Sequence, residues 1–180
     1  MRGFESGVTG VRGDCAQNGV SDNIADDMKN SPEIVLDTNV LVSALRSRLG
    51  PSFALVQAVR DQQITLRCSP ALFLEYEDVL NRAEQLSGFG LNAEDIEVVL
   101  ADLATYVKPV ITHYQWRPQL RDPSDEMVLE AAVNAPGSVI VTYNLRDFSS
   151  AANFGIKVFN PEQTFRYFSF SRPTLKGSPL

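Results

Sequence analysis

The sequence predicts an α/β protein in which helices cover both faces of a central, mostly parallel sheet. Short, wholly apolar segments typical of buried strands alternate with longer segments that place apolar residues at helical spacing. The chain has 180 residues, 44% of them hydrophobic, which is enough for one domain with a substantial core. We expect this domain to span residues 32–168, between a flexible leader at 1–31 and a loose tail at 169–180.

The first half of the domain contains two expected strands and three expected helices. The segment IVL, which precedes Asp37, is apolar and β-branched, as in a buried strand. Pro51 suits the first turn of a helix, and Ser69 is a typical N-cap residue. In order, the expected elements are a strand at 33–37, helices at 39–46 and 51–61, a strand at 64–68 and a helix from 69 to about 82.

The second half adds three helices and two strands. Asn92 suits the cap of a helix whose apolar residues recur every three or four positions. The segment Asp122-Pro123-Ser124 is expected to open the next helix, and Asn160-Pro161 the last one. In order, the expected elements are a helix at 92–107, a helix from 122, strands at 138–142 and 156–159, and a helix from 160 to about 167.

The leader at residues 1–31 is rich in Gly, Asn, Asp and Ser, so no packed element is expected there. Met28, followed by Lys29, offers an alternative start, and the sequence leaves open whether the residues before it are native. The chain lacks the apolar core of a signal peptide and any run near the ~20 apolar residues of a membrane span. Cys15 and Cys68 are far apart, which fits a reducing cytoplasm.

The formal net charge of −6 argues against a protein that coats nucleic acid. It does not exclude an enzyme that acts on nucleic acid, because carboxylates that hold divalent cations also make a chain acidic. One histidine and two cysteines predict no zinc site. His113 and Trp116 lie in a segment without clear pattern, and both are expected to be structural.

Acidic residues follow or adjoin the expected carboxyl ends of the strands, where α/β folds place their functional sites. Asp37 ends the first strand, and Asp147 closes the segment after the third. Glu75 lies on the helix that follows the second strand, while Asp122 and Asp125 stand where a helix is expected to start. Seven other acids are expected to be surface charge: Glu77, Asp78, Glu94, Asp95, Glu97, Glu126 and Glu130.

Each of the five acids at or near the strand ends also has a purely structural interpretation. Asp37 could cap the helix that follows it, as Asp122 and Asp125 could cap theirs. Asp147 could serve a turn, and Glu75 could be a solvated helix residue. Together, however, several carboxylates at one sheet edge would repel one another and acquire raised pKa values. A hard cation such as Mg²⁺ or Mn²⁺ removes that conflict, so the pattern predicts a divalent-metal site.

Four segments occur in an order that resembles the PIN-domain family: IVLDTNVLVSAL, SPALFLEYEDVL, RDPSDEMVLEAAV and VIVTYNLRDF. The resemblance covers residues 33–168 and lies in the PilT N-terminus-like branch that includes VapC-type toxins. It is nearest to PIN proteins classed as toxin components of toxin–antitoxin systems. It implies a three-layer α/β/α fold and a ribonuclease that hydrolyses RNA phosphodiester bonds with Mg²⁺ or Mn²⁺.

The resemblance also implies a role for individual residues. The catalytic residues and metal ligands would be Asp37, Glu75, Asp125 and Asp147. Four residues would support them: Asn39, Asp122, Thr142 and Asn144. Asn144 departs from the nearest subgroup, which often carries Asp there. Because the protein is acidic, local cations must meet the RNA backbone; Arg46 and Arg48 rank first, with Arg82, Arg121 and Arg146 as further options.

PIN toxins of this kind commonly dimerise and are held inactive by an antitoxin, which implies both partners here. Residues Phe53, Leu55, Val56 and Val59 could serve a dimer, although core packing explains most of them equally well. The alternative function is a non-catalytic PIN-fold interaction module, which loss of an acid would have favoured. A haloacid-dehalogenase-like enzyme needs Asp in place of Asn39, and a receiver domain needs a lysine after its last strand, so neither fits.

Overall fold

Five strands form a single sheet in which every neighbouring pair runs parallel. The order across the sheet is β3-β2-β1-β4-β5. The strands are β1 (Glu33–Leu36), β2 (Thr65–Cys68), β3 (Val107–Pro109), β4 (Val139–Val141) and β5 (Val158–Phe159). The predicted parallel sheet is therefore confirmed.

The structure is a computed structural model that describes residues 31–115 and 117–169. The leader, the alternative start at Met28, Trp116 and the tail beyond Ser169 lie outside these residues, so the predictions for them stay predictions. Within the described ranges, no helix combines the length and the apolar character needed to cross a membrane.

Helices connect the strands, and most begin where the capping residues predict. Ser69 accepts a hydrogen bond from the Leu72 N–H, and Asn92 and Asn160 each form a capping box with the residue three positions later. The described helices are α2 (Thr38–Arg46), α3 (Pro51–Arg60), α4 (Pro70–Leu80), α5 (Ala83–Phe89), α6 (Ala93–Tyr106), α7 (Glu126–Val133), the 3₁₀ helix η1 (Ser149–Phe154) and α8 (Pro161–Tyr167).

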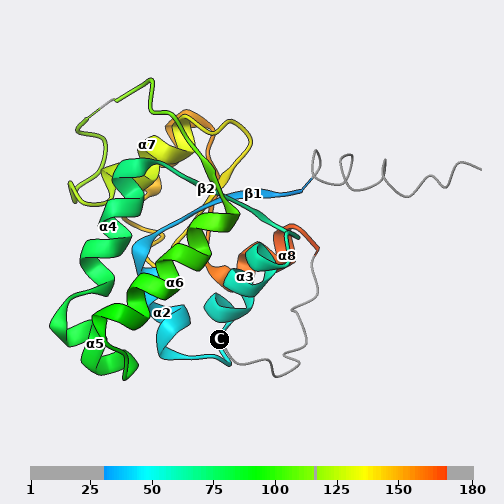
Figure 1. Cartoon of the computed structure of the whole chain (residues 1–180). Helices are drawn as coiled ribbons and strands as arrows, with labels where there is room; N and C mark the ends of the chain where they lie inside the picture. The colour runs from blue at the N-terminus through cyan, green and yellow to red at the C-terminus, as the bar shows by residue number, and fades with distance from the viewer. Residues whose placement is uncertain (1–30, 116, 170–180) are drawn as a thin grey trace, which may run out of the picture. The chain divides into compact units, whose positions relative to one another are not determined.

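The strand order places the helices on two faces of the sheet. The chain steps from β1 to β2 to β3 in one direction and then crosses back to β4. Because such crossovers are right-handed, a reversal of direction moves the connecting helix to the opposite face. Figure 1 shows α7 on one side of β1 and β2, with α3 and α6 on the other, and α7 packs against β1 and β4. The predicted three-layer arrangement is confirmed.

The start of α7 differs from the prediction. The helix begins at Glu126, four residues after the expected start. Asp122 instead accepts hydrogen bonds from the N–H and hydroxyl of Ser124, at 2.9 and 2.6 Å, and so stabilises a turn. The helix starts later than predicted because Asp122 accepts the hydrogen bonds of Ser124 within this turn and does not cap a helix.

Three elements were not expected from the sequence: α5, η1 and β3. The strand β3 lies at the edge of the sheet, where Lys108 and Pro109 are exposed. A proline lacks a backbone donor but is tolerated in an edge strand. Because an edge strand is partly exposed, its sequence also lacks the apolar run that marks a central strand, and β3 was missed for this reason.

The core lies on both faces of the central strands. Ile34, Val35 and Leu36 of β1 are fully buried, and so is Ile140 of β4. Leu55 and Val59 are buried in the same core, which confirms core packing for these two residues, whereas Phe53 and Val56 are partly exposed. Residues buried on both faces hold β1 and β4 rigidly, so the segments that leave their carboxyl ends start from defined positions.

Candidate active site

The register of β1 and β4 brings two predicted site residues together. Leu36 pairs with Val141, so Asp37 and Thr142 leave their strands at the same level of the sheet. The Asp37 N–H donates to the Val141 carbonyl at 2.9 Å and extends the ladder by one residue. As a result, the Asp37 side chain is 5% exposed at the carboxyl edge of the sheet.

The two oxygens of the Asp37 carboxylate have different surroundings. Oδ2 accepts from the Thr142 hydroxyl at 2.5 Å and from Asn39 Nδ2 at 2.6 Å. Oδ1 accepts a long contact from the Asn39 N–H, at 3.4 Å, and the Thr38 backbone N–H also acts on the carboxylate. Asp37 thus also caps α2, as its structural interpretation predicts. Burial raises the pKa of Asp37, although these hydrogen bonds act in the opposite direction.

A buried tyrosine positions Glu75 beside this edge. The Tyr76 side chain is fully buried, and its hydroxyl donates to the carbonyl of Leu36, the residue before Asp37. This hydrogen bond holds α4 over the end of β1. Burial raises the pKa of the half-buried Glu75; Arg82 lowers it, and the charges of nearby acids, Asp37 among them, raise it further.

Asp125 carries the clearest electrostatic signature of the site. It occupies the N-cap position of α7, but its side chain makes no capping hydrogen bond, so the capping interpretation is wrong for this residue. Burial raises its pKa from 3.8 to about 6, and the charges of Asp37, Asp122 and Asp147 contribute in that order. Three other aspartates, two of which come from distant parts of the chain, therefore lie within electrostatic reach of Asp125.

The segment after β4 supplies the last two predicted residues. Asp147 is exposed, and its N–H donates to the Asn144 carbonyl at 3.1 Å, so it lies in a turn. The Asn144 N–H donates to the Thr142 hydroxyl oxygen at 2.9 Å. Thr142 therefore links this turn to Asp37. Asp147 therefore lies in a turn, as its structural interpretation predicts, and its charge also acts on Asp125.

Arg46 and Arg48 are not brought to this edge by the fold. They lie at and just beyond the end of α2, a helix of nine residues, which places them about 13 Å along the helix axis from Asp37. Both are exposed, and Arg46 donates to Gln85 Oε1 of α5 at 2.8 Å. Arg82, an option of second rank, pairs with Asp78 at 2.8 Å and acts on Glu75.

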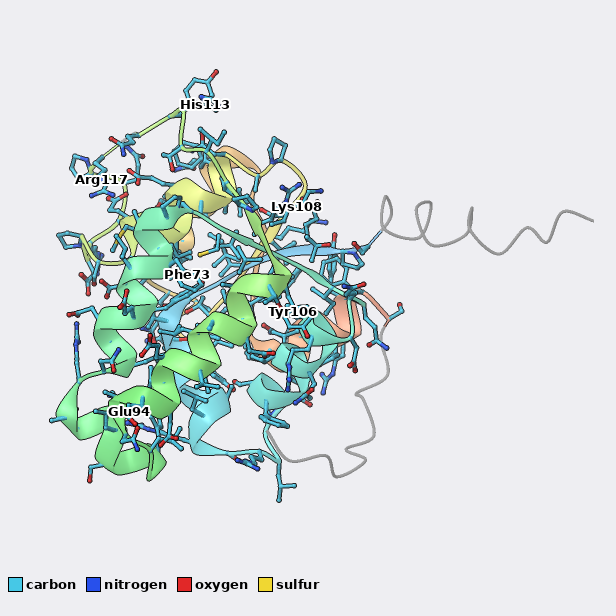
Figure 2. All side chains as sticks on the ribbon, in the orientation of Figure 1. Phe73, Glu94, Tyr106, Lys108, His113 and Arg117 are labelled. Carbon is cyan, nitrogen blue, oxygen red and sulfur yellow. The ribbon has the colours of Figure 1, made fainter. Side chains whose placement is uncertain are left out.

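Two acids that the sequence assigns to the surface are buried instead. Glu126 and Glu130 are 2% and 6% exposed. Glu126 Oε1 accepts from two backbone N–H groups of the preceding loop, and Glu130 is bound by Arg117 through two hydrogen bonds of 2.6 and 2.8 Å. The error arises because that loop, seen beside α7 with Arg117 labelled in Figure 2, folds back over the helix. Its course could not be read from local pattern.

The same loop carries His113. Its side chain is exposed. Its backbone N–H donates to Asn134 Oδ1 at 2.8 Å, so any structural role of His113 lies in the backbone. Neither ring nitrogen contributes to the acidic edge through any described contact.

A divalent cation fits the donor set of the acidic edge, although the described side chains do not preform a coordination shell. Within residues 31–115 and 117–169, no group of three or more His, Cys, Asp or Glu side chains is arranged to hold a metal ion. Mg²⁺ typically keeps several waters and takes only one or two carboxylates directly. Asp37 Oδ1 has no short hydrogen bond among these residues, and a cation would relieve the repulsion on Asp125. Both features suit a hydrated hard ion.

The fold and this edge define an α/β protein of the kind that gathers carboxylates outside the carboxyl ends of parallel strands. A family model for the PIN domain matches residues 33–146, and the chain belongs to this family. PIN domains are generally nucleases and typically use divalent metal ions. The match includes Asp37, Glu75 and Asp125 and ends one residue before Asp147. Comparison with curated proteins found no significant match.

Proposed function

We propose that this chain is an endoribonuclease that hydrolyses RNA phosphodiester bonds with Mg²⁺ or Mn²⁺. The observation that carries the proposal is the gathering of carboxylates at the carboxyl edge, where burial and the charges of three other aspartates raise the pKa of Asp125 to about 6. An isolated structural acid has no such neighbours. In a PIN domain, the arrangement is the expected environment of a bound cation.

Each residue has a distinct part in this proposal. Asp37, Asp125 and Asp147 would hold the cation, and Glu75 would hold it too or orient the attacking water. The bound ion would supply an activated water and would neutralise charge that develops on the phosphate. The side chains of Thr142 and Asn39 hold Asp37 through Oδ2, and Oδ1, which accepts the 3.4 Å contact from the Asn39 N–H, would bind the ion.

The remaining residues would support the site in two ways, by their place in the turn after β4 or by their charge. Asn144 is tied by its backbone to Thr142 and is close to Asp147 in the chain, so its amide oxygen could serve the ion or its waters. Asp122 adds negative charge that acts on both Glu75 and Asp125. Exposed arginines would meet the RNA backbone away from the acids, with Arg46 and Arg48 as the first candidates.

We further propose that the protein acts in the cytoplasm as the toxin of a toxin–antitoxin pair and forms a homodimer. The sequence resemblance supports this role. An apolar groove of about 420 Å³ between α2, α3, α5 and α6 offers a surface for either protein partner, and Phe53 and Val56 line it. Light scattering after gel filtration tests the dimer, and co-purification with the product of an adjacent gene tests the antitoxin.

The decisive experiment is cleavage of a mixed-sequence single-stranded RNA by the purified full chain. Reactions would contain Mg²⁺, Mn²⁺ or EDTA, with a DNA of the same sequence in parallel. Asp37→Asn keeps the shape and the helix cap but removes the charge, whereas Asp61→Asn makes the same change at an exposed position after α3. We expect metal-dependent RNA cleavage by the wild type and by Asp61→Asn, and its loss in Asp37→Asn.

Two results would contradict the proposal. Equal cleavage by all three proteins in EDTA would assign the activity to a contaminant. A folded wild type that neither cleaves RNA nor binds Mn²⁺ in a calorimetric titration would instead favour the non-catalytic interaction module. Preference for the DNA substrate would correct the substrate class while preserving the metal-dependent chemistry.

A further inference from the structure

Tyr143 presents an aromatic side chain at the edge of the acidic site. It directly follows Thr142, which binds Asp37, and it is 44% exposed. Its backbone N–H donates to Asn39 Oδ1 at 3.2 Å. The backbone of Tyr143 is therefore bonded to the same asparagine that holds the Asp37 carboxylate.

The hydroxyl of Tyr143 is anchored as well. It shares a hydrogen bond of 2.7 Å with the hydroxyl of Ser52, a fully buried residue of α3, and accepts a longer one of 3.5 Å from Ser43 of α2. The hydroxyl end is therefore held at a buried serine, while the residue as a whole is 44% exposed. A side chain with two rotatable bonds that is held at both ends loses little entropy on binding.

Single exposed aromatic residues are common and need no functional explanation by themselves. Two other described tyrosines show the contrast. Tyr167 packs against Phe159 and Lys157, so its ring has partners within the protein, and Tyr114 lies in the loop after β3. Of the three, Tyr143 is the one bonded to a residue that holds Asp37.

The electrostatics of the site favour an uncharged binding contribution at this position. Several carboxylates surround the place where a phosphate would lie, and the protein carries a net charge of −6. Stacking of a base on an aromatic ring does not depend on charge and tolerates any base, because every base has a π-face. Bases in an A-form duplex are stacked on their neighbours and do not offer that face.

We propose that Tyr143 stacks on an unpaired nucleobase adjacent to the phosphate that is cleaved, and thereby selects single-stranded RNA. This inference rests on the proposed nuclease function and adds the substrate's secondary structure to it. Tyr143 would act in binding, through the base, and would take no part in the chemical step.

The test measures equilibrium binding of a short, labelled single-stranded RNA to the full chain in Mg²⁺. All proteins carry Asp37→Asn, which prevents cleavage during the measurement. Tyr143→Phe and Tyr143→Leu both lose the hydrogen bond to Ser52, and they differ only in whether a ring remains. We expect Tyr143→Leu to bind roughly 5- to 100-fold more weakly than Tyr143→Phe. Tyr114→Leu removes an exposed ring elsewhere and should bind like the background protein.

A second set of RNAs carries one abasic nucleotide at each position in turn. At one position, loss of the base should weaken binding to Tyr143→Phe but cause no further loss in Tyr143→Leu, because the ring and the base form one contact. Thermal unfolding confirms that both variants are folded.

Equal affinity of the Phe and Leu variants, or additive losses at every abasic position, would overturn the stacking inference. If wild-type cleavage still required metal, the proposed function would stand on its own. Absence of RNA binding by every protein, together with absence of cleavage by the wild type, would reject both. An equally tight complex with the same RNA in duplex form would overturn selection of single strands.

Discussion

Replacement of Asp125 by asparagine should stabilise the metal-free protein. Asparagine keeps the size of the side chain but removes a charge that burial and three other aspartates disfavour. Most substitutions at functional sites are expected to reduce stability or leave it unchanged, so an increase in stability is a specific consequence of the repulsion at this edge.

The magnitude follows from the pKa of Asp125, which the fold raises from 3.8 to about 6. A shift of this size corresponds to about 3 kcal/mol of unfolding free energy at neutral pH. Asp125 is only half-buried, so solvent screening reduces the expected gain to about 1 kcal/mol. For a chain of this length, that gain raises the melting temperature by about 2–4 °C.

The pH dependence of this gain has a defined sign. The folded protein binds the Asp125 proton more tightly than the unfolded chain, because its folded pKa is the higher one. Protonation therefore stabilises the wild type fully below the unfolded pKa of about 4, and this contribution is lost as the pH rises through about 6. The advantage of Asp125→Asn should be absent near pH 4, grow between pH 4 and 6, and stay constant above pH 7.

Thermal unfolding followed by circular dichroism, in EDTA and in Mg²⁺, is the appropriate assay. Glu97→Gln serves as the control, because it removes one negative charge from an exposed position on α6 that does not act on Asp125. Mg²⁺ should stabilise the wild type and Glu97→Gln, and it should stabilise Asp125→Asn less. A lower melting temperature for Asp125→Asn in EDTA at pH 7, or an equal response of all three proteins to Mg²⁺, would refute the reasoning.

Two further predictions concern the hydroxyl that holds Asp37 and the ion pair of the buried Glu130. Thr142→Val removes the shortest hydrogen bond to Asp37, and we expect roughly 10- to 100-fold weaker Mn²⁺ binding by calorimetry; unchanged affinity would exclude this role of the hydroxyl. Arg117→Met leaves the buried Glu130 without its charged partner and should lower the unfolding free energy by about 1–3 kcal/mol in urea titrations. Arg166→Met breaks an exposed ion pair and should cost at most about 0.5 kcal/mol, so equal losses would contradict the argument.

Local signals in the sequence account for most of the fold. The caps at Ser69, Asn92 and Asn160 act over three residues, and each starts a helix where it is predicted. The apolar strands at the centre of the sheet are equally local. Where the local signal is weak, as in the exposed edge strand β3, or conflicts with a turn, as at Asp122, the prediction is wrong or missing.

Burial on α7 shows a second limit. Glu126 and Glu130 stand on a helix without any sign in their neighbours that they are buried. Their burial follows from the loop that ends near residue 120, which brings backbone N–H groups and Arg117 onto the helix. The two acids are buried because these partners cover them, and the partners lie 6 to 13 residues away along an irregular path, beyond the reach of helical or strand periodicity.

The sequence by itself determined which side chains this protein has for chemistry and the elements that carry them. It places Asp37 at the end of a strand and Asp125 next to a helix start, because strand and helix signals act over a few residues. Only the tertiary structure decided that Thr142, 105 residues from Asp37, donates to it, and that the charges of three other aspartates act on Asp125. The reason is physical: such convergence depends on the order and register of the strands, which long-range packing sets and no local pattern encodes.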